Sequence, residues 1–392
     1  MKRFIFLILI ICLILSGCST HNEKSVQKAD TSSGIWLTYS EINSLLASPD
    51  GFEKAFSEVL ANCKALKIQN VFIHIRSHCD SIFVSEYFPI TKSAESVAFD
   101  IFEYMIDGFH KENIKVHAWI NPYRVTTAHS DVSLLNTESP AYKWLNDQSP
   151  ENDKNICLAD GIYLNPAEPQ VRELIISGIK EVLSKYAVDG IHFDDYFYPT
   201  VDPAFDSISY NSYKENTANP IPLDDWRRTN VNILISGCKS AIKNQNENII
   251  FSISPAVSLD KNFNELYADV EHWCKNGFVD WIIPQLYFGF NYPDKNFCFE
   301  KLLKDWMKIC SINEKIELHI GLASYKIGTE SALDKEEWNN NQDIIARQAK
   351  ICLDENSVNG YVFFSYSSLF GNQPLQTAEK QNYQKLMKSV SQ

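Results

Sequence analysis

The sequence predicts a single α/β domain, a (β/α)8 barrel of the TIM type, over residues 34–390. Short apolar runs rich in β-branched residues alternate with longer amphipathic stretches, and each run precedes its stretch. The chain is 45% hydrophobic and 12% aromatic, so it can bury a large core. The runs number eight, which is the number of strands that closes such a barrel.

The predicted strands are the apolar runs, bounded by polar or turn-forming residues. In order along the chain they are Gly34–Tyr39, Val71–Arg76, Lys115–Pro122, Gly190–Tyr196, Ile249–Pro255, Val279–Tyr287, Glu317–Ser324 and Gly360–Ser365.

The predicted helices are the amphipathic stretches between the strands, with polar residues at their ends. They are Gly51–Lys67, Ile101–Glu112, Glu168–Tyr186, Leu223–Lys243, Tyr267–Asn276, Phe297–Ile309, Asn339–Asp354 and Gln376–Ser389. A doubly wound open sheet is the alternative, but no glycine-rich fingerprint follows the first strand.

Residues 1–17 have the layout of a signal peptide, because Lys2 and Arg3 precede an apolar run that is shorter than the roughly 20 residues of a membrane span. The segment that ends at Gly17 and Cys18 resembles the lipobox of bacterial lipoproteins, which implies lipidation of Cys18. An uncleaved anchor helix and an ordinary signal peptide are the alternatives. Residues 18–33 are polar and predict a lipidated tether. We therefore expect an extracytoplasmic protein of the cell envelope, held to a bacterial membrane at Cys18.

The formal net charge of -13 argues against nucleic acid or an anionic membrane surface as a partner, because both require basic patches. Neutral polymers remain compatible, and we expect a monomer. The chain has 10 cysteines but no CxxC spacing. Buried free thiols are expected in the helix-like stretches, with a disulfide among them as the alternative. These cysteines are Cys63, Cys238, Cys274, Cys310 and Cys352.

A barrel carries its functional residues at the carboxyl ends of its strands, and these positions are polar and aromatic here. Aromatic rings stack on sugar faces and amides read hydroxyl groups, so the pattern predicts a site for a sugar polymer. Solvated loops would explain the polar residues but not the rings. The candidate binding residues are Arg76, His117, Asn121, Tyr123, Arg124, Asn165, His192, Tyr196, Gln285, Tyr287 and Tyr325.

Several segments resemble the bacterial glycosyl-hydrolase-like lipoproteins of the DigH and YngK type. They are G-I-W-L-T at 34–38, V-H-A-W-I-N-P-Y-R at 116–124, Y-L-N-P at 163–166, V-D-G-I-H-F-D-D-Y-F-Y-P at 188–199, W-R-R-T-N-V-N at 226–232, S-I-S-P at 252–255, P-Q-L-Y at 284–287 and F-F-S-Y at 363–366. The resemblance covers nearly the whole mature chain. It implies a TIM-like barrel, an extracytoplasmic location and hydrolysis of peptidoglycan glycan strands. The chain departs from the family at Ser33, where Arg is usual, and at His78-Cys79, where a Pro/Gly pair is commoner.

The fourth strand carries the candidate catalytic carboxylates, Asp194 and Asp195. Strand residues alternate faces, so His192 and Asp194 point the same way, which we expect to be the barrel mouth. The D-G-I-H-F-D segment is also similar to the fourth strand of α-amylase-type glycosidases, and that resemblance implies that Asp194 is the nucleophile. We expect Arg76 and His117 to keep Asp194 ionised.

The second acid of a glycosidase lies about 5 Å from the first in retaining enzymes and about 6.5–9.5 Å away in inverting ones. Adjacent residues fit neither spacing easily. Either Asp195 turns into the mouth as the strand ends, or Asp80, beyond the second strand, supplies the proton. The fifth strand, where α-amylases carry their acid, offers only Ser252, Ser254 and Pro255. Helix capping, or pairing with Arg227 or Arg228, is the structural alternative for the two aspartates.

Three strand histidines, His74, His117 and His192, allow a zinc hypothesis, but no H-x-H or H-E-x-x-H pairing occurs. We expect no metal and no cofactor. Arg76, Arg124 and Arg227 are candidates for gripping a carboxylate of the substrate, although Arg227 and Arg228 also fit a salt-bridged surface. Two other functions remain open: a catalytically inactive glycan-binding lipoprotein, favoured by the missing fifth-strand acid, and a deacetylase-like metalloenzyme.

Overall fold

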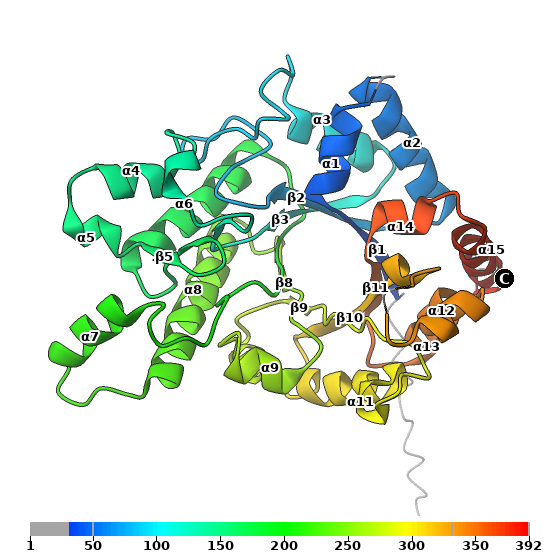
Figure 1. Cartoon of the computed structure of the whole chain (residues 1–392). Coiled ribbons are helices and arrows are strands. Elements are labelled where there is room, and N and C mark those ends of the chain that lie inside the picture. The colour runs from blue at the N-terminus through cyan, green and yellow to red at the C-terminus, as the bar shows by residue number, and fades with distance from the viewer. Residues whose placement is uncertain (1–30, 49–50, 331, 391–392) are drawn as a thin grey trace, which may run out of the picture.

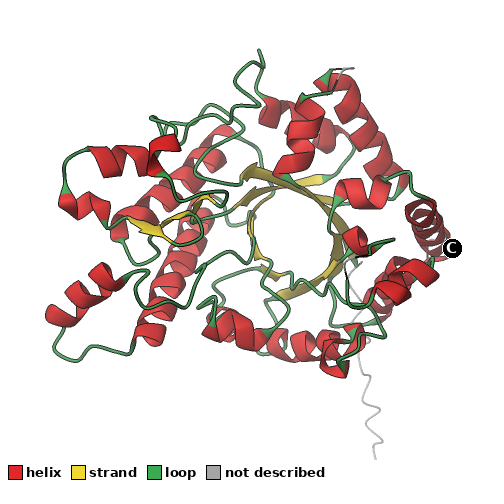
Figure 2. Cartoon of the chain, in the orientation of Figure 1, coloured by secondary structure: helices red, strands yellow, loops and turns green. Residues whose placement is uncertain are grey.

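The computed structural model describes residues 31–48, 51–330 and 332–390. Eight parallel strands close into a barrel in the order β1-β11-β10-β9-β8-β7-β3-β2, and helices surround it (Figure 1; Figure 2). Each strand overlaps one of the predicted runs, so the predicted (β/α)8 fold is confirmed. The strands are β1 (Ser32–Leu37), β2 (Asn70–Arg76), β3 (Lys115–Ile120), β7 (Gly190–Phe193), β8 (Ile250–Ile253), β9 (Trp281–Ile282), β10 (Glu317–Leu322) and β11 (Gly360–Phe363).

Large rings fill the inside of the barrel. An interior cluster comprises Trp36, Phe72, Trp119, Trp281, Ile283 and Val362. Three buried histidines, His117, His192 and His319, share this space and stack on or lean against the rings. Glycine makes room for the ring of His117, since a Cβ at Gly190 would lie 2.2 Å from its Nδ1. The interior is therefore a packed core that supports the mouth from below.

The helices pack their apolar faces on the outside of the strands. In α11 the buried residues recur every three or four positions, as a one-sided helix requires. Asp100 caps α3 by accepting a hydrogen bond from the Glu103 amide, and α10 ends at Gly277 in the left-handed region. The main helices are α2 (Phe52–Ala65), α3 (Ile101–Lys111), α6 (Pro169–Lys185), α8 (Leu223–Gln245), α10 (Val270–Asn276), α11 (Phe299–Cys310), α13 (Ile344–Asp354) and α15 (Pro374–Val390).

The long connection after β3 forms an ordered side unit. It contains an antiparallel sheet in the order β4-β6-β5, built from β4 (Arg124–Thr126), β5 (Ile156–Leu158) and β6 (Ile162–Leu164). With α4 (Pro140–Asn146), α5 (Pro150–Asp153) and α7 (Ser207–Glu215), it extends to one side of the ring (Figure 1). The remaining short helices are α1 (Tyr39–Leu46), α9 (Leu259–Asn264), α12 (Lys335–Asn340) and α14 (Tyr366–Phe370).

The first strand begins at Ser32, so Ser32 and Ser33 belong to the barrel and not to the expected tether. The expected signal peptide, Cys18 and the rest of the tether lie outside the described residues. None of the helices in the described ranges combines the length and apolarity needed to cross a membrane. The cysteines within those ranges all carry free thiols, which confirms this prediction for Cys63, Cys238, Cys274, Cys310 and Cys352.

Candidate functional site

A pocket of about 310 Å³ opens where the strands end. Its walls come from most of the strands, because the carboxyl ends of parallel strands meet at one face of a barrel. Within the described chain, the carboxylates in its lining are those of Asp194 and Asp195. The full lining is Trp36, Thr38, Tyr39, His74, Trp119, Arg124, Asp194, Asp195, Tyr196, Ser254, Gln285, Tyr287, Tyr325 and Phe364.

Asp194 follows the end of β7 and is 3% exposed. Nε1 of Trp119 donates to one of its carboxylate oxygens at 3.0 Å, and Nδ2 of Asn121 donates to the other at 3.0 Å. Burial, and then the neighbouring Asp195, raise the pKa of Asp194 to about 6, while Arg124 and the two hydrogen bonds oppose that rise. Both oxygens are therefore fixed, and the group titrates close to neutral pH.

Asp195 is half-buried and more open to the pocket than Asp194. Burial raises its pKa, and a hydrogen bond from Gln285 works in the opposite direction. Gln285 is itself anchored, because its Nε2 donates to the carbonyl oxygen of Ser254 at 3.1 Å. The two acids thus differ in access to a ligand. Both oxygens of Asp194 are held by hydrogen bonds, whereas Asp195 is more exposed to the pocket.

Arg124 brings a positive charge to this pair. Its guanidinium lies 3.8 Å from the centre of the Tyr196 ring, and its charge opposes the raised pKa of both aspartates. The backbone amide of Arg124 donates to Oδ1 of Asn121 at 2.9 Å, and Nδ2 of Asn121 donates to Asp194. The Asn121 side chain therefore fixes the position of Arg124 relative to Asp194. The expectation that Arg76 and His117 keep Asp194 ionised is therefore corrected, since Trp119, Asn121 and Arg124 have that effect.

Aromatic rings wall the other side of the pocket. Tyr287 lies 5.6 Å from Tyr325 and 5.6 Å from Phe364, measured between ring centres. Tyr325 and Tyr196 are 44% and 53% exposed, so their rings are available to a ligand. This is the combination of apolar faces and a few fixed polar groups that suits a sugar ring.

Six predicted binding residues do not line this pocket, and one of them, Asn121, acts on it only through its hydrogen bond to Asp194. Arg76 follows a register shift in the β2–β3 pairing, which turns its side chain outward, and its guanidinium lies 4.1 Å from the centre of the Phe88 ring. Tyr123 is 1% exposed within the outer core. Asn165 is also buried and donates to the Lys154 carbonyl and to Ser209. None of these three side chains lines the pocket, so none of them faces a ligand that binds there.

The two remaining residues, His117 and His192, lie in the barrel interior and are 0% exposed. His117 Nε2 pairs with Oδ1 of Asn70 at 3.1 Å. Nε2 of His192 accepts from the Trp36 indole at 3.1 Å, so its Nδ1 carries the proton toward Ser252 at 2.8 Å. Both support the floor of the site instead of binding substrate. These partners occupy His117 and His192, two of the three histidines of the zinc hypothesis, and the described residues contain no cluster of three metal-ligating side chains.

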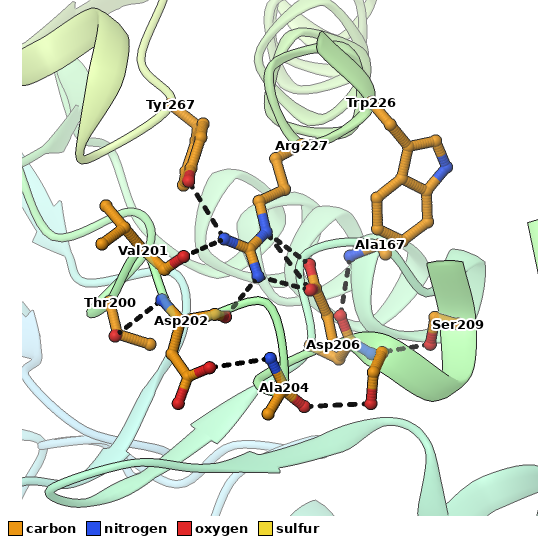
Figure 3. A network of polar contacts seen from close by, with 12 residues as sticks. Ala167, Thr200, Val201, Asp202, Ala204, Asp206, Ser209, Trp226, Arg227 and Tyr267 are labelled. Atoms are coloured by element: carbon orange, nitrogen blue, oxygen red, sulfur yellow. Dashed lines mark hydrogen bonds and ion pairs between the residues drawn. The ribbon is translucent and has the colours of Figure 1, made fainter. Parts of the chain in front are cut away.

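Asp80 lines a separate, adjoining pocket and not the one that holds Asp194. Burial raises its pKa to about 6. Arg227, a candidate for gripping a carboxylate, is instead 0% exposed and paired with the buried Asp206 (Figure 3). Arg228 pairs with Asp225 at 2.6 Å on the surface. Of the three arginines proposed for the substrate, the pocket contains only Arg124.

Comparison with known proteins decides the family. The model of the family described as Glycosyl hydrolase-like 10 matches residues 32–340. This chain belongs to that family. The match runs from the first residue of β1 to the end of α12, and so it includes every residue that lines the pocket except Phe364.

Two curated relatives are similar over most of the chain. Glycosyl hydrolase YngK of Bacillus subtilis is 29% identical over 343 residues, which are 82% of this chain and 64% of that protein. Glycosyl hydrolase DigH of Escherichia coli is 29% identical over 315 residues, which are 72% of this chain and 68% of that protein. The chain therefore spans about two thirds of the length of these relatives, and slightly less for YngK.

Solved structures share the fold at low sequence identity. The PgaB (BpsB) glycoside hydrolase domain from Bordetella bronchiseptica superposes with a TM-score of 0.61 at 12% identity, covering 90% of this chain and 99% of that one. Alpha-L-fucosidase isoenzyme 2 from Paenibacillus thiaminolyticus gives a TM-score of 0.54 at 10% identity, covering 92% of this chain and 50% of the fucosidase. At this identity the likeness establishes the barrel architecture alone.

Some residues of the pocket were missed by the sequence reasoning. Trp36, Thr38 and Trp119 belong to the segments at 34–38 and 116–124 that carry the family resemblance. No residue of the first segment was predicted to bind substrate, and the second contributed only His117, Asn121, Tyr123 and Arg124. The period-two alternation that was applied to Asp194 would also have placed Trp119 on the face of Asn121. Tyr39 and Phe364 stand at or next to the carboxyl ends of the predicted strands Gly34–Tyr39 and Gly360–Ser365, so their position at a strand end was the signal that could have identified them.

Proposed function

We propose that this chain is an extracytoplasmic, lipid-anchored glycoside hydrolase that cleaves the glycosidic bonds of a bacterial polysaccharide, with peptidoglycan glycan strands as the substrate. One observation carries the catalytic part: two adjacent carboxyl groups with raised pKa values stand at the end of the fourth barrel strand, inside a ring-walled pocket. The family membership and the names of the relatives support the reaction class.

The two acids have different catalytic roles, which follow from their different access to the pocket. Asp195, which is the more open of the two to the pocket, supplies the proton to the leaving glycosidic oxygen, and burial raises its pKa. Asp194, whose oxygens are fixed by Trp119 and Asn121, presents negative charge to the oxocarbenium-like centre that develops in the transition state. Trp119 and Asn121 keep this carboxylate in place during the reaction, so little reorganisation is needed.

The pocket also supports the choice of substrate. The exposed rings of Tyr39, Tyr196 and Tyr325 offer stacking faces for pyranose units. Arg124 offers a guanidinium that can bind a carboxylate, and the lactyl group of muramic acid carries one. A glycan that alternates uncharged and carboxylated sugars fits both features.

The test replaces Asp194 by Asn, which is nearly isosteric. Purified Asp194→Asn protein should bind peptide-free glycan strands but cleave them about 10²–10⁴ times more slowly than the wild type, because it lacks the negative charge in the transition state. Product chromatography measures the rate, and circular dichroism checks the fold. Asp107→Asn, an exposed carboxylate on α3, is the control and should leave the rate unchanged. Retention of more than about a tenth of wild-type activity, a change of about 1.4 kcal/mol in the barrier, would rule out this role for Asp194.

A catalytically inactive glycan-binding protein is the second candidate. The observation in its favour is that both described carboxylates of the pocket come from one strand end, with none on the facing wall. The same experiment separates the two functions. Binding of glycan strands by the wild type without any products would establish the binding protein, and cleavage by the wild type would exclude it.

A further inference from the structure

A second pocket, of about 540 Å³, adjoins the first at the mouth of the barrel. Tyr39 and His74 belong to the walls of both pockets. The far side of the second pocket is formed by α1 and by the connection that follows β2, through residues such as Asn43, Asp80 and Lys92. The two pockets are therefore neighbouring sections of one depression, and Tyr39 and His74 are their common border.

Tyr39 forms an aromatic step on this border. It is 41% exposed, and its ring meets His74 and His78 edge-on at 5.6 and 5.7 Å between ring centres. These two edge contacts fix the orientation of the ring and leave part of it exposed to solvent. An upright, exposed ring between two polar pockets offers stacking surface to a chain that passes from one pocket into the other.

His74 provides an independent observation that points to a ligand in this pocket. It is 3% exposed and stacks on Trp119 at 3.7 Å, yet neither of its ring nitrogens has a hydrogen-bond partner within the described chain. Buried polar atoms are nearly always paired, and an unpaired one costs free energy. Burial keeps the pKa of His74 well below its usual range, so the neutral ring has one donor and one acceptor. A sugar hydroxyl group can use either.

The rest of the second pocket is polar and mixed in charge. Ser93 donates to Oδ1 of Asn43 at 2.6 Å, which leaves the amide nitrogen of Asn43 for a ligand oxygen. Asp80 is half-buried and accepts the His78 amide at 3.3 Å, while Lys92 is exposed at the rim. Amide, carboxyl and ammonium groups around an aromatic edge suit the hydroxyl and acetamido groups of a sugar better than an apolar ligand.

We propose that this second pocket is a further sugar-binding subsite, which takes the unit of the glycan chain next to the one held beside Asp194. Tyr39 and His74 then contact both units. Asp80 contributes to binding at this subsite and does not deliver the proton to the scissile bond. The proposal rests on the proposed glycosidase function and extends it to substrates longer than the first pocket can hold.

The experiment measures how binding and turnover depend on substrate length. Peptide-free glycan strands are fractionated into di-, tetra-, hexa- and octasaccharides, and the dissociation constant of each is measured by calorimetry with the Asp194→Asn protein. Once a strand is long enough to fill both pockets, binding should tighten by about tenfold, which corresponds to about 1.4 kcal/mol. Introducing Asp80→Asn or Lys92→Ala into the same protein should reduce this gain to less than about threefold. Lys275→Ala, which removes a lysine from a pocket on the outside of the barrel, is the matched control and should keep the whole gain.

Turnover distinguishes a subsite from a catalytic role for Asp80. In the otherwise wild-type protein, Asp80→Asn should lower kcat/KM for the longest strands more than for the shortest cleaved strand. An equal loss of kcat on strands of every length would make Asp80 the proton donor and would overturn the proposal. An unchanged gain with length in both variants would also overturn it while leaving the glycosidase function intact. Failure of the wild type to bind or cleave any strand would instead refute the proposed function.

Discussion

Asn121 affects the pKa of Asp194 through a hydrogen bond to its carboxylate. Its Oδ1 accepts the backbone amides of Tyr123 and Arg124 at 3.3 and 2.9 Å. The orientation of the amide is therefore fixed, and Nδ2 must point at Asp194. Since a donor to the ionised carboxylate favours ionisation, Asn121 counteracts the burial that raises the pKa of Asp194.

Removal of this donor should make Asp194 harder to ionise. In Asn121→Ala the pKa of Asp194 rises further above its wild-type value of about 6, so activity that requires the ionised group is lost at a higher pH. We expect the acidic limb of the kcat/KM profile to move upward by about one pH unit, because a hydrogen bond to a charged group is worth about 1.5 kcal/mol and one unit corresponds to 1.36 kcal/mol. Hydrolysis rates measured at a series of pH values check this.

Asn165→Ala is the control for this profile, since it also removes a buried, hydrogen-bonded amide, but one that donates to the Lys154 carbonyl and Ser209 and not to Asp194. It should lower thermal stability without moving the limb. If Asn121→Ala lost stability while its acidic limb stayed in place, Asp194 would not be the group that titrates in the free enzyme.

At the scale of elements, a buried ion pair joins the start of α7 to α8. Arg227 of α8 binds Asp206, the cap residue of α7, through Nε and Nη2, the latter at 2.6 Å (Figure 3). The other donors of the guanidinium reach the carbonyl oxygens of Val201 and Asp202 and the hydroxyl group of Tyr267. One side chain thus joins the connection after β7, α7 and the segment before α10.

Breaking this pair should cost far more than breaking a surface pair. Asp206→Ala leaves the Arg227 charge buried and uncompensated, so we expect the free energy of unfolding to fall by about 3–5 kcal/mol. Asp225→Ala breaks the exposed Arg228–Asp225 pair and should cost at most about 1 kcal/mol. Urea unfolding measures both. Similar losses in the two variants would show that the buried pair contributes little to holding α7 on the barrel.

At the scale of the whole molecule, the barrel could be predicted because its strands and helices differ in length and periodicity. The local sequence pattern did not predict three other features of the structure. The sheet β4-β6-β5 is built from three-residue strands, too short for periodicity to register. Arg76 faces outward because of a register shift that only the pairing of β2 with β3 reveals. Asp80 and Asp194 both follow strand ends, so the sequence predicted one site for both. They lie in separate pockets because the closed barrel places Tyr39 and His74 between them.

The direction of the strands also orients the molecule. All barrel strands are parallel, so β1 begins at Ser32 on the face opposite the pocket, where the strands end. Ser32 and the pocket therefore lie on opposite faces of the barrel.

The lipid anchor that we propose at Cys18 predicts that this residue determines the location of the protein. We expect Cys18→Ser to prevent lipidation and to release the protein from the membrane fraction, since the apolar run before it is too short to hold the chain as an ordinary span. Cys12→Ser, which changes a cysteine inside that run, is the control and should leave both lipidation and location unchanged. Cell fractionation, with mass spectrometry of the mature N-terminus, measures the outcome. Equal membrane retention of an unprocessed precursor in the wild type and in Cys18→Ser would show that residues 1–17 act as an uncleaved anchor.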